Sequence, residues 1–261
     1  MQQANNQTSR HSPAIIRCLR TIHLSLCVLI PTLFALCYGF TLWLFSWNKR
    51  FALNQMGRFL GWFGLLLARV KLDIRNHKII NQHRPALFVF NHRSGLDPII
   101  LCRLIQRDVI GIAKQELKHH PLLGPLLRFG DTLFVDRHHQ QVSSNDMTPA
   151  IEALQSGLSI AIAPEGTRLN AETATQRKLG QFRKGAFRIS QQSGSSIVPI
   201  VIHDADACLR PGSSQLYSGT IHIEILEPIS PETQSQMSVL ALTEYVHQRM
   251  LLALEQGRQQ K

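Results

Sequence analysis

A run of 24 residues without a charged side chain, Leu24–Trp47 (LSLCVLIPTLFALCYGFTLWLFSW), sets the first limit on this fold. As a helix it would be about 36 Å long at about 1.5 Å per residue, more than the roughly 30 Å of a bilayer's hydrocarbon core. Lys49 and Arg50 follow its last tryptophan, a pattern typical of an interfacial anchor. The run therefore predicts a membrane-embedded helix, which either spans the bilayer or, given Pro31, lies in one leaflet as part of a hairpin.

Other interpretations of this run fit less well. A signal peptide would be shorter and would end at a small-residue cleavage site, which does not follow here. A buried helix of a soluble protein rarely stays uncharged over this length. Basic residues flank the two ends of the run equally, so charge does not set its orientation.

A second apolar stretch, Phe59–Val70, is too short to span and is predicted to be interfacial or to pack on the first. Gly57, Gly61 and Gly64 recur at helical spacing and would permit a close approach of another helix. The polar residues 1–13 are predicted to be disordered. The predicted domains are thus a disordered terminus at 1–13, membrane-embedded or interfacial helices at 14–70 and a third unit at 71–261.

The charge balance points to anionic partners. The formal net charge is +11 and the sequence pI is about 10.0, which suits nucleic acid, anionic lipid or phosphorylated substrates. The five cysteines are scattered and form no CxxC motif, so neither a disulfide framework nor a zinc site is indicated and a reducing compartment is predicted.

From Lys71 onward short apolar runs alternate with amphipathic ones. Buried strands are predicted at 86–90, 109–113, 132–135, 159–163 and 197–202, and an edge or half-exposed strand at 220–225. Helices are predicted near 98–106, 146–156, 182–193 and 238–255. This alternation predicts an α/β fold with a layered sheet flanked by helices, preceded by the N-terminal membrane-embedded helical segment.

The first strand exit, FVFNHRSGLDP at 88–98, carries the strongest chemical signal. On a regular helix His92 and Asp97 would lie about 140° apart. Asp97 before Pro98 is a good helix start, with Asp as the N-cap, so 91–97 is predicted to be a loop that folds the carboxylate back onto the imidazole. Such a pair is a general base with its orienting carboxylate. The alternative is that Asp97 is only a cap and His92 only a loop residue; Ser94 lacks the G-x-S-x-G setting of a nucleophile.

Further strand exits carry polar groups suited to an anionic ligand. Arg137 ends the strand in GDTLFVDR, and Glu165–Arg168 (EGTR) combines a carboxylate, a flexible turn and a guanidinium. In FRKGAF, Lys184 lies near the positive end of a helix. The competing interpretations are a surface ion pair for Arg137, a Glu165–Arg168 pair and a solvated face for Lys184. The pairs His119-His120 and His138-His139 have no ligand partners at metal spacing, so no metal site is predicted.

The order of these motifs resembles the glycerophospholipid acyltransferases, and most of all the bacterial 1-acylglycerol-3-phosphate (lysophosphatidic acid) acyltransferases. The resemblance covers roughly 70–205 and includes N-H-x4-D at 91–97, F-V-D-R at 134–137, E-G-T-R at 165–168 with F-R-K-G-A-F at 182–187, and V-P-I at 198–200. One departure is R-S-G-L at 93–96, where many members carry an aromatic residue near position 95.

The resemblance implies acyl transfer from a thioester to a lysophospholipid hydroxyl, giving phosphatidic acid. His92 would deprotonate the hydroxyl and Asp97 would hold His92. The implied substrate-binding residues are Arg137, Glu165, Gly166, Thr167, Arg168 and Lys184. Backbone amides of the 91–97 loop or of the 198–200 strand would stabilise the oxyanion. No covalent intermediate, metal or cofactor is implied; acyl-ACP or acyl-CoA is a co-substrate, and membrane lipids are partners.

The implied location is the bacterial inner membrane with the catalytic domain on the cytoplasmic side. Alternatives remain open at this point. One is O-acyl transfer to another lysolipid such as lyso-ornithine lipid, and another is a non-catalytic, basic membrane-binding protein. Nucleic-acid binding is disfavoured because basic residues are spread along the chain and no binding motif is present.

Overall fold

The computed structural model describes residues 14–119, 123–135, 144–166 and 179–259. The predicted disordered terminus at 1–13 lies outside the described residues. Within them, seven strands form one sheet in the order β1-β7-β6-β2-β5-β3-β4. Their bounds are β1 Val70–Arg75, β2 Ala86–Phe90, β3 Val109–Lys114, β4 Leu133–Val135, β5 Ser159–Ile162, β6 Ser196–His203 and β7 Gly219–Ile225.

The sheet is mixed, because β6 and β7 pair antiparallel while the other neighbouring strands pair in parallel. The strand predictions at 86–90, 109–113, 132–135, 159–163 and 197–202 are confirmed within a residue or so at their ends. The edge assignment for 220–225 is wrong: β7 lies between β6 and β1, and β1 is the edge. Its half-exposed character is confirmed, since burial alternates along it.

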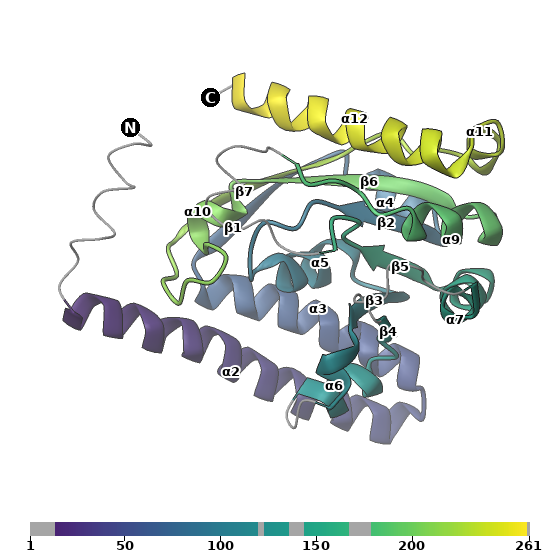
Figure 1. The fold of residues 1–261 in the computed structure, drawn as a ribbon. Coiled ribbons are helices and arrows are strands. Elements are labelled where there is room, and N and C mark those ends of the chain that lie inside the picture. The colour runs from purple at the N-terminus through teal and green to yellow at the C-terminus, as the bar shows by residue number, and fades with distance from the viewer. Residues whose placement is uncertain (1–13, 120–122, 136–143, 167–178, 260–261) are drawn as a thin grey trace.

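Helices cover both faces of the sheet (Figure 1). The longer ones include α5 Asp97–Ile105, α7 Ser144–Gln155, α9 Gly185–Ser193 and α12 Val239–Gln259, which confirm the helix predictions. The remaining short elements are α4 Lys78–Gln82, η1 Gln115–His119, α6 Leu123–Phe129, α10 Ala205–Cys208 and α11 Pro231–Ser235. The layered α/β class predicted from the alternation of runs is therefore correct.

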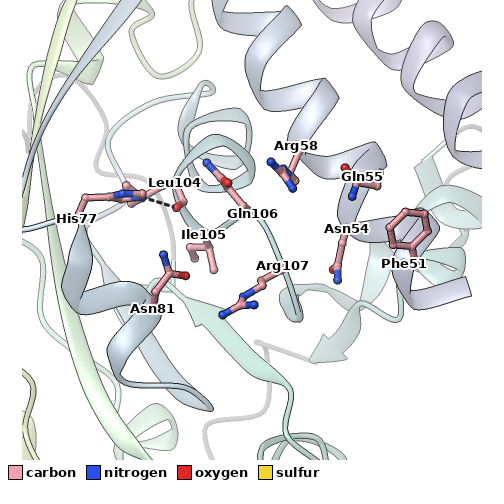
Figure 2. A pocket seen from close by; sticks show the side chains of 10 residues that line it. All are labelled: Phe51, Asn54, Gln55, Arg58, His77, Asn81, Leu104, Ile105, Gln106 and Arg107. Carbon is pink, nitrogen blue, oxygen red and sulfur yellow. Dashed lines mark hydrogen bonds between the residues drawn. The ribbon is translucent and has the colours of Figure 1, made fainter. Parts of the chain in front are cut away.

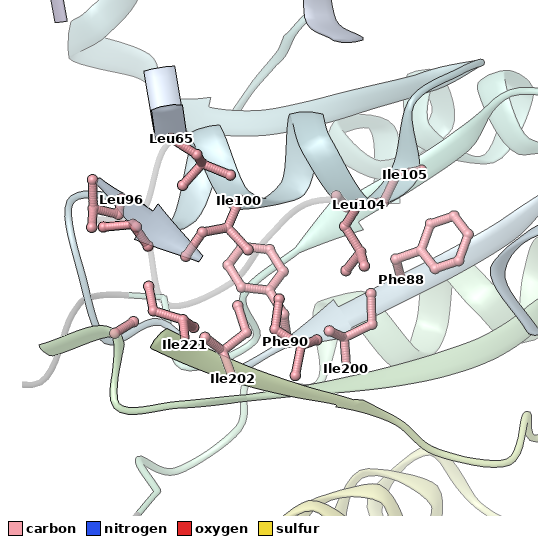
Figure 3. Close-up of a cluster of buried hydrophobic side chains, with 14 of the residues drawn as sticks. Leu65, Phe88, Phe90, Leu96, Ile100, Leu104, Ile105, Ile200, Ile202 and Ile221 are labelled. Atoms are coloured by element: carbon pink, nitrogen blue, oxygen red, sulfur yellow. The ribbon is translucent and has the colours of Figure 1, made fainter. Parts of the chain in front are cut away.

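The two-residue period of the strands divides the core into two clusters. Phe88 and Phe90 of β2 point to the face covered by α5 and α3, where they pack with Leu65, Ile100, Leu104, Ile200 and Ile202 (Figure 3). Leu87 and Val89 point to the other face and pack with residues of α7, α9 and α12. Because both faces are covered, β2 is buried along its whole length.

Helix α2, Ala14–Ser46, runs along α3, Lys49–Leu67 (Figure 1), and contributes Cys27 to the edge of the first core cluster. Its buried positions recur every four residues, Cys27, Pro31, Ala35 and Gly39, and form one narrow stripe. Phe34 and Tyr38 contact Phe63 and Phe59 of α3, 6.0 and 5.6 Å between ring centroids. The second apolar stretch therefore does pack on the first, as part of a longer helix.

Many of the other residues of α2 are apolar and exposed. By length and composition this helix could cross a membrane, and only 17% of its most apolar 18-residue window is buried. An apolar face of this extent indicates association with a membrane.

Two of the glycines of α3 face α5 and not α2. A Cβ on Gly61 would lie 2.4 Å from the backbone nitrogen of Arg103 in α5, and one on Gly64 would lie 3.2 Å from Ile99. Gly57 faces open space. The close approach predicted from the glycine spacing is thus between α3 and the helix that follows the His92 loop, and it involves two of the three glycines.

Candidate active site

The loop between β2 and α5 brings His92 and Asp97 together. The Nδ1 atom of His92 lies 2.6 Å from Asp97 Oδ2. The carboxylate is almost fully buried, whereas 22% of the His92 side chain is exposed. An ionised carboxylate only accepts hydrogen bonds, so Nδ1 is the donor in this contact, and in a neutral imidazole Nε2 is then the unprotonated nitrogen. The contact required by the loop prediction is present, with the imidazole reachable from outside.

Asp97 is not the N-cap that its place before Pro98 suggested. Leu96 is the N-cap, without a side-chain cap, and Asp97 is the first helical residue. Its Oδ2 accepts from the backbone N–H groups of Arg93 and Ser94, at 2.9 and 3.0 Å, in addition to His92. The carboxylate therefore orders the loop N-terminal to it, and a single oxygen does so.

Two further residues fix this loop to the sheet. Asn91 is fully buried, and its side chain donates to the carbonyl of Ile202 and accepts from the same residue's N–H, at 2.8 and 2.7 Å. The buried hydroxyl of Ser94 donates to the carbonyl of Leu209 at 2.7 Å. These contacts make Asn91 and Ser94 structural supports of the loop.

Glu165 reaches the same loop from β5, which pairs in parallel with β2. The register of these strands makes their carboxyl ends neighbours. Oε1 of Glu165 accepts from the His92 N–H at 2.9 Å and Oε2 accepts from the Gly180 N–H at 2.7 Å. Burial raises the pKa of Glu165, and the two backbone hydrogen bonds and the charge of Arg93 oppose this rise. Glu165 therefore ties the His92 loop to the segment that precedes α9.

Gly166 turns the chain immediately after Glu165, with φ of +76°. A Cβ at this position would also lie 2.8 Å from Nε of Arg183. The N–H of Arg183 donates to the carbonyl of Pro164 at 2.9 Å. Glycine is required here both by the backbone conformation and by the arginine above it.

The other predicted site residues are placed as follows. Lys184 is exposed and is the N-cap position of α9, without a side-chain cap. Arg137, Thr167 and Arg168 lie outside the described residues. The structure thus brings together His92, Asp97, Glu165 and Gly166 and places Lys184 on the segment tied to them.

The sequence placed Asn91 in the first motif but gave it no role, and it did not identify Arg93 or Gly180 as part of this site. Arg93 is only 6% exposed, and its charge opposes the rise that burial causes in the pKa of Glu165. A Cβ on Gly180 would lie 2.7 Å from Glu165 Oε2. No local pattern reveals these roles, because each depends on a partner at least 15 residues away in the sequence.

The chain is similar to several known proteins. A model of the Acyltransferase family matches residues 71–203. The 1-acyl-sn-glycerol-3-phosphate acyltransferase of Saccharomyces cerevisiae is 29% identical over 174 residues, which cover 66% of this chain and 56% of the yeast protein. The 1-acyl-sn-glycerol-3-phosphate acyltransferase beta of Homo sapiens is 28% identical over 182 residues, 69% of this chain and 64% of that protein. The chain thus spans less than two thirds of the length of these two relatives.

A solved structure is similar over nearly the whole chain. The crystal structure of the 1-acyl-sn-glycerophosphate (LPA) acyltransferase PlsC from Thermotoga maritima superposes with a TM-score of 0.74 and 21% identity. The match covers 94% of this chain and 97% of that one. At this level of identity the likeness is one of fold.

Proposed function

Because the chain belongs to the acyltransferase family, we propose that it transfers an acyl group from a thioester to the free hydroxyl of 1-acylglycerol 3-phosphate, giving phosphatidic acid. The observation that carries the proposal is the His92–Asp97 contact of 2.6 Å at the end of a buried parallel strand. The names of the yeast, human and Thermotoga relatives support this acceptor.

His92 is the proposed general base. Asp97 accepts from Nδ1–H and thereby fixes the tautomer in which Nε2 is unprotonated. Nε2 takes the proton of the acceptor hydroxyl as the oxygen attacks the thioester carbonyl carbon. The buried carboxylate stabilises the imidazolium that forms. A partly exposed imidazole held by a buried carboxylate is suited to this step.

The second half of the reaction returns the proton. The tetrahedral intermediate collapses, the carbon–sulfur bond breaks, and His92 Nε2 gives its proton to the leaving thiolate. The new ester bond replaces the thioester and no group remains on the protein. Direct attack of this kind needs no nucleophilic side chain, and the buried hydroxyl of Ser94 already donates to the carbonyl of Leu209.

The oxyanion of the intermediate needs N–H donors that are not already used. In the His92 loop the following backbone N–H groups already donate to an acceptor within the protein: those of His92, Arg93, Ser94, Leu96 and Asp97. The partly buried Gly95 N–H makes no hydrogen bond within the described residues. Pro199 has no N–H to give. We therefore favour Gly95 as the donor from this loop.

The acceptor's phosphate is assigned to the basic residues of the motifs. Arg137 and Arg168 offer guanidinium forks, which suit two-point contact with a phosphate, and Thr167 and Gly166 would line the same turn. Lys184 is exposed on the segment joined to Glu165. We assign Glu165 itself to holding the His92 loop, since both of its oxygens accept backbone N–H groups.

The proposed setting is the cytoplasmic face of a bacterial inner membrane. There the apolar face of α2 would contact lipid, the acceptor would enter from the bilayer, and acyl-ACP or acyl-CoA would arrive from the cytosol. The net charge of +11 favours both an anionic surface and an acidic donor.

The test is a lysolipid panel assayed with the purified chain and both donors. We expect transfer to 1-acylglycerol 3-phosphate, and a loss of roughly 10³-fold or more in the His92→Ala variant. The chain offers a matched control in His222, which lies 2.9 Å from Asp73 in an exposed pair on β7 and β1. His222→Ala should keep its activity. Turnover retained by His92→Ala rejects the mechanism, and preference for an acceptor without a phosphomonoester, such as lyso-ornithine lipid, rejects the substrate.

A further inference from the structure

A polar cavity of about 490 Å³ lies away from the His92 site, at the other end of α5. Asp97 begins this helix, whereas the cavity is bordered by its last turn and the residues after it, 104–107. Nine residues of helix separate the two ends by roughly 13 Å. The other walls come from α3 and α4 (Figure 2). A volume of this size is in the range of ligand-binding cavities.

The lining of this cavity is basic. It contains Arg58 and Arg107, five further polar residues and no carboxylate; the others are Phe51, Asn54, Gln55, His77, Asn81, Leu104, Ile105 and Gln106. Figure 2 shows the polar side chains of α3 and of the α5 end around a common hollow. Neither guanidinium, of Arg58 or of Arg107, makes a hydrogen bond or ion pair in the part of the chain that the structure describes.

The charges behind the lining do not neutralise it. Arg84 donates to the carbonyls of Arg107 and Ile105, and burial together with the charge of Arg107 lowers the pKa of Arg84 to about 10. Asp108 is the nearby anion, but it is shared between Asn54 at 2.9 Å and Arg50 at 3.6 Å. Positive charge thus exceeds negative charge around the cavity.

The end of α5 does not offset this excess. A helix C-terminus presents carbonyl groups and a partial negative charge, but the Leu104 carbonyl accepts from His77 and the Ile105 carbonyl accepts from Arg84. The cavity is therefore suited to a group that carries negative charge and several acceptor oxygens.

The α3 wall of the cavity includes an exposed aromatic residue of the N-terminal helices. Phe51, Asn54, Gln55 and Arg58 follow one face of α3, at spacings of three and four residues. Phe51 is 43% exposed, and the turn just before it carries Trp47 at 87% exposed. Exposed aromatic residues of this kind are typical of the level of lipid head groups.

We propose that this cavity binds the phosphate head group of an anionic membrane phospholipid, at a site separate from that of the reacting acceptor. Two guanidinium groups supply the donors for a phosphate, and Phe51 with Trp47 provides an apolar edge for the attached glycerol and chains. The inference does not depend on the chemistry proposed for His92.

The test measures binding of phosphatidylglycerol, which is neither the proposed acceptor nor the proposed product. The purified chain in neutral detergent micelles is titrated with this lipid and followed by tryptophan fluorescence and native mass spectrometry. Arg58→Ala/Arg107→Ala should bind it about 30-fold more weakly, the effect of two basic residues at an anionic lipid surface. Arg188→Ala/Arg249→Ala removes the same charge from α9 and α12, on the opposite face of the sheet, and should bind within about threefold of the wild type.

Soluble phosphate and phosphatidylcholine are the other arms of the experiment. Both should bind the wild type much more weakly than phosphatidylglycerol. If the Arg58/Arg107 variant keeps wild-type affinity, or if inorganic phosphate binds as tightly as the lipid, the lipid assignment is wrong. Thermal unfolding checks the fold; should the alanine variant not fold, Arg58→Gln/Arg107→Gln takes its place with the same expected weakening.

Discussion

Replacing Glu165 by alanine separates a positioning role from substrate binding. The change removes the acceptor of two backbone N–H groups, those of His92 at 2.9 Å and Gly180 at 2.7 Å. A hydrogen bond to a charged group contributes roughly 1.5–3 kcal/mol, so the two together contribute about 3–6 kcal/mol. Relief of the buried charge, whose desolvation raises the pKa of Glu165, offsets part of this. We expect a net loss of about 2–4 kcal/mol in the free energy of unfolding.

The same change should affect catalysis through the position of His92. Without the carboxylate the loop is held at Asp97 and Asn91 but no longer at the His92 N–H. A displacement of about 1 Å at a reacting group typically costs about 100-fold in rate. We therefore expect kcat to fall about 100-fold while KM for the lysolipid changes by less than about threefold.

Thermal unfolding and steady-state kinetics below the unfolding transition measure both effects. The melting temperature should fall by roughly 5–15 °C. Glu152→Ala, an exposed change on α7, is the control and should alter neither quantity. If Glu165→Ala leaves stability within about 0.5 kcal/mol of the wild type and instead raises KM about tenfold or more, the carboxylate contacts the acceptor and the positioning argument is refuted.

Three further predictions follow from the same geometry. Asp97→Asn keeps the shape of the side chain but removes its charge, and it places an amide where the buried Oδ1 has no partner among the described residues. We expect kcat to fall roughly 10³- to 10⁴-fold. A fall of less than tenfold would show that the charge is not needed. Gly61→Ala should lower the free energy of unfolding by about 1–3 kcal/mol, because the added Cβ would clash with the α5 backbone. Gly57→Ala, whose Cβ would face open space, should raise it by about 0.5–1 kcal/mol. Equal effects of the two variants in chemical denaturation would contradict the α3–α5 contact. Burial raises the pKa of Glu165, so the pH-dependent part of its contribution to stability is fully present below the unfolded carboxyl pKa and is lost as pH rises through the folded pKa. The melting temperature of the wild type should therefore fall relative to that of Glu165→Gln over this pH range, and a pH-independent difference would argue against the raised pKa.

Much of the fold was accessible from local patterns. The buried runs of β2 and β6 are uniformly apolar because helices cover both faces of the sheet, and such runs are readable residue by residue. The uncharged run that became α2 was equally clear. The edge strand β1 was not predicted although VKLDIR alternates apolar and charged residues, which is the local pattern of a half-buried strand. Short elements such as α4 and α10 carry too few residues to show a period.

The order of the strands in the sheet could not be predicted from local sequence patterns. The sequence predicted β7 as an edge or half-exposed strand. It is half-exposed but not an edge, because β1 pairs with it, and that pairing joins residues almost 150 positions apart. The same limit applies to Glu165, which local spacing paired with Arg168 or a ligand. Its contact with His92 exists because β5 lies beside β2 in parallel, so that their carboxyl ends meet.

The sequence by itself determined the elements with strong short-range signals: the apolar N-terminal helix, the buried strands and the spacing that folds Asp97 back onto His92. The period of side chains along a helix or strand acts over a few residues, so it can be read locally. The preference of the residue before proline misplaced the start of α5 by one residue, since Asp97 is already helical. Only the tertiary structure decided which helix the α3 glycines contact, what Glu165 holds, and that Arg58 and Arg107 share a cavity. These depend on packing between segments that are distant in the sequence, where shape and burial select the partner.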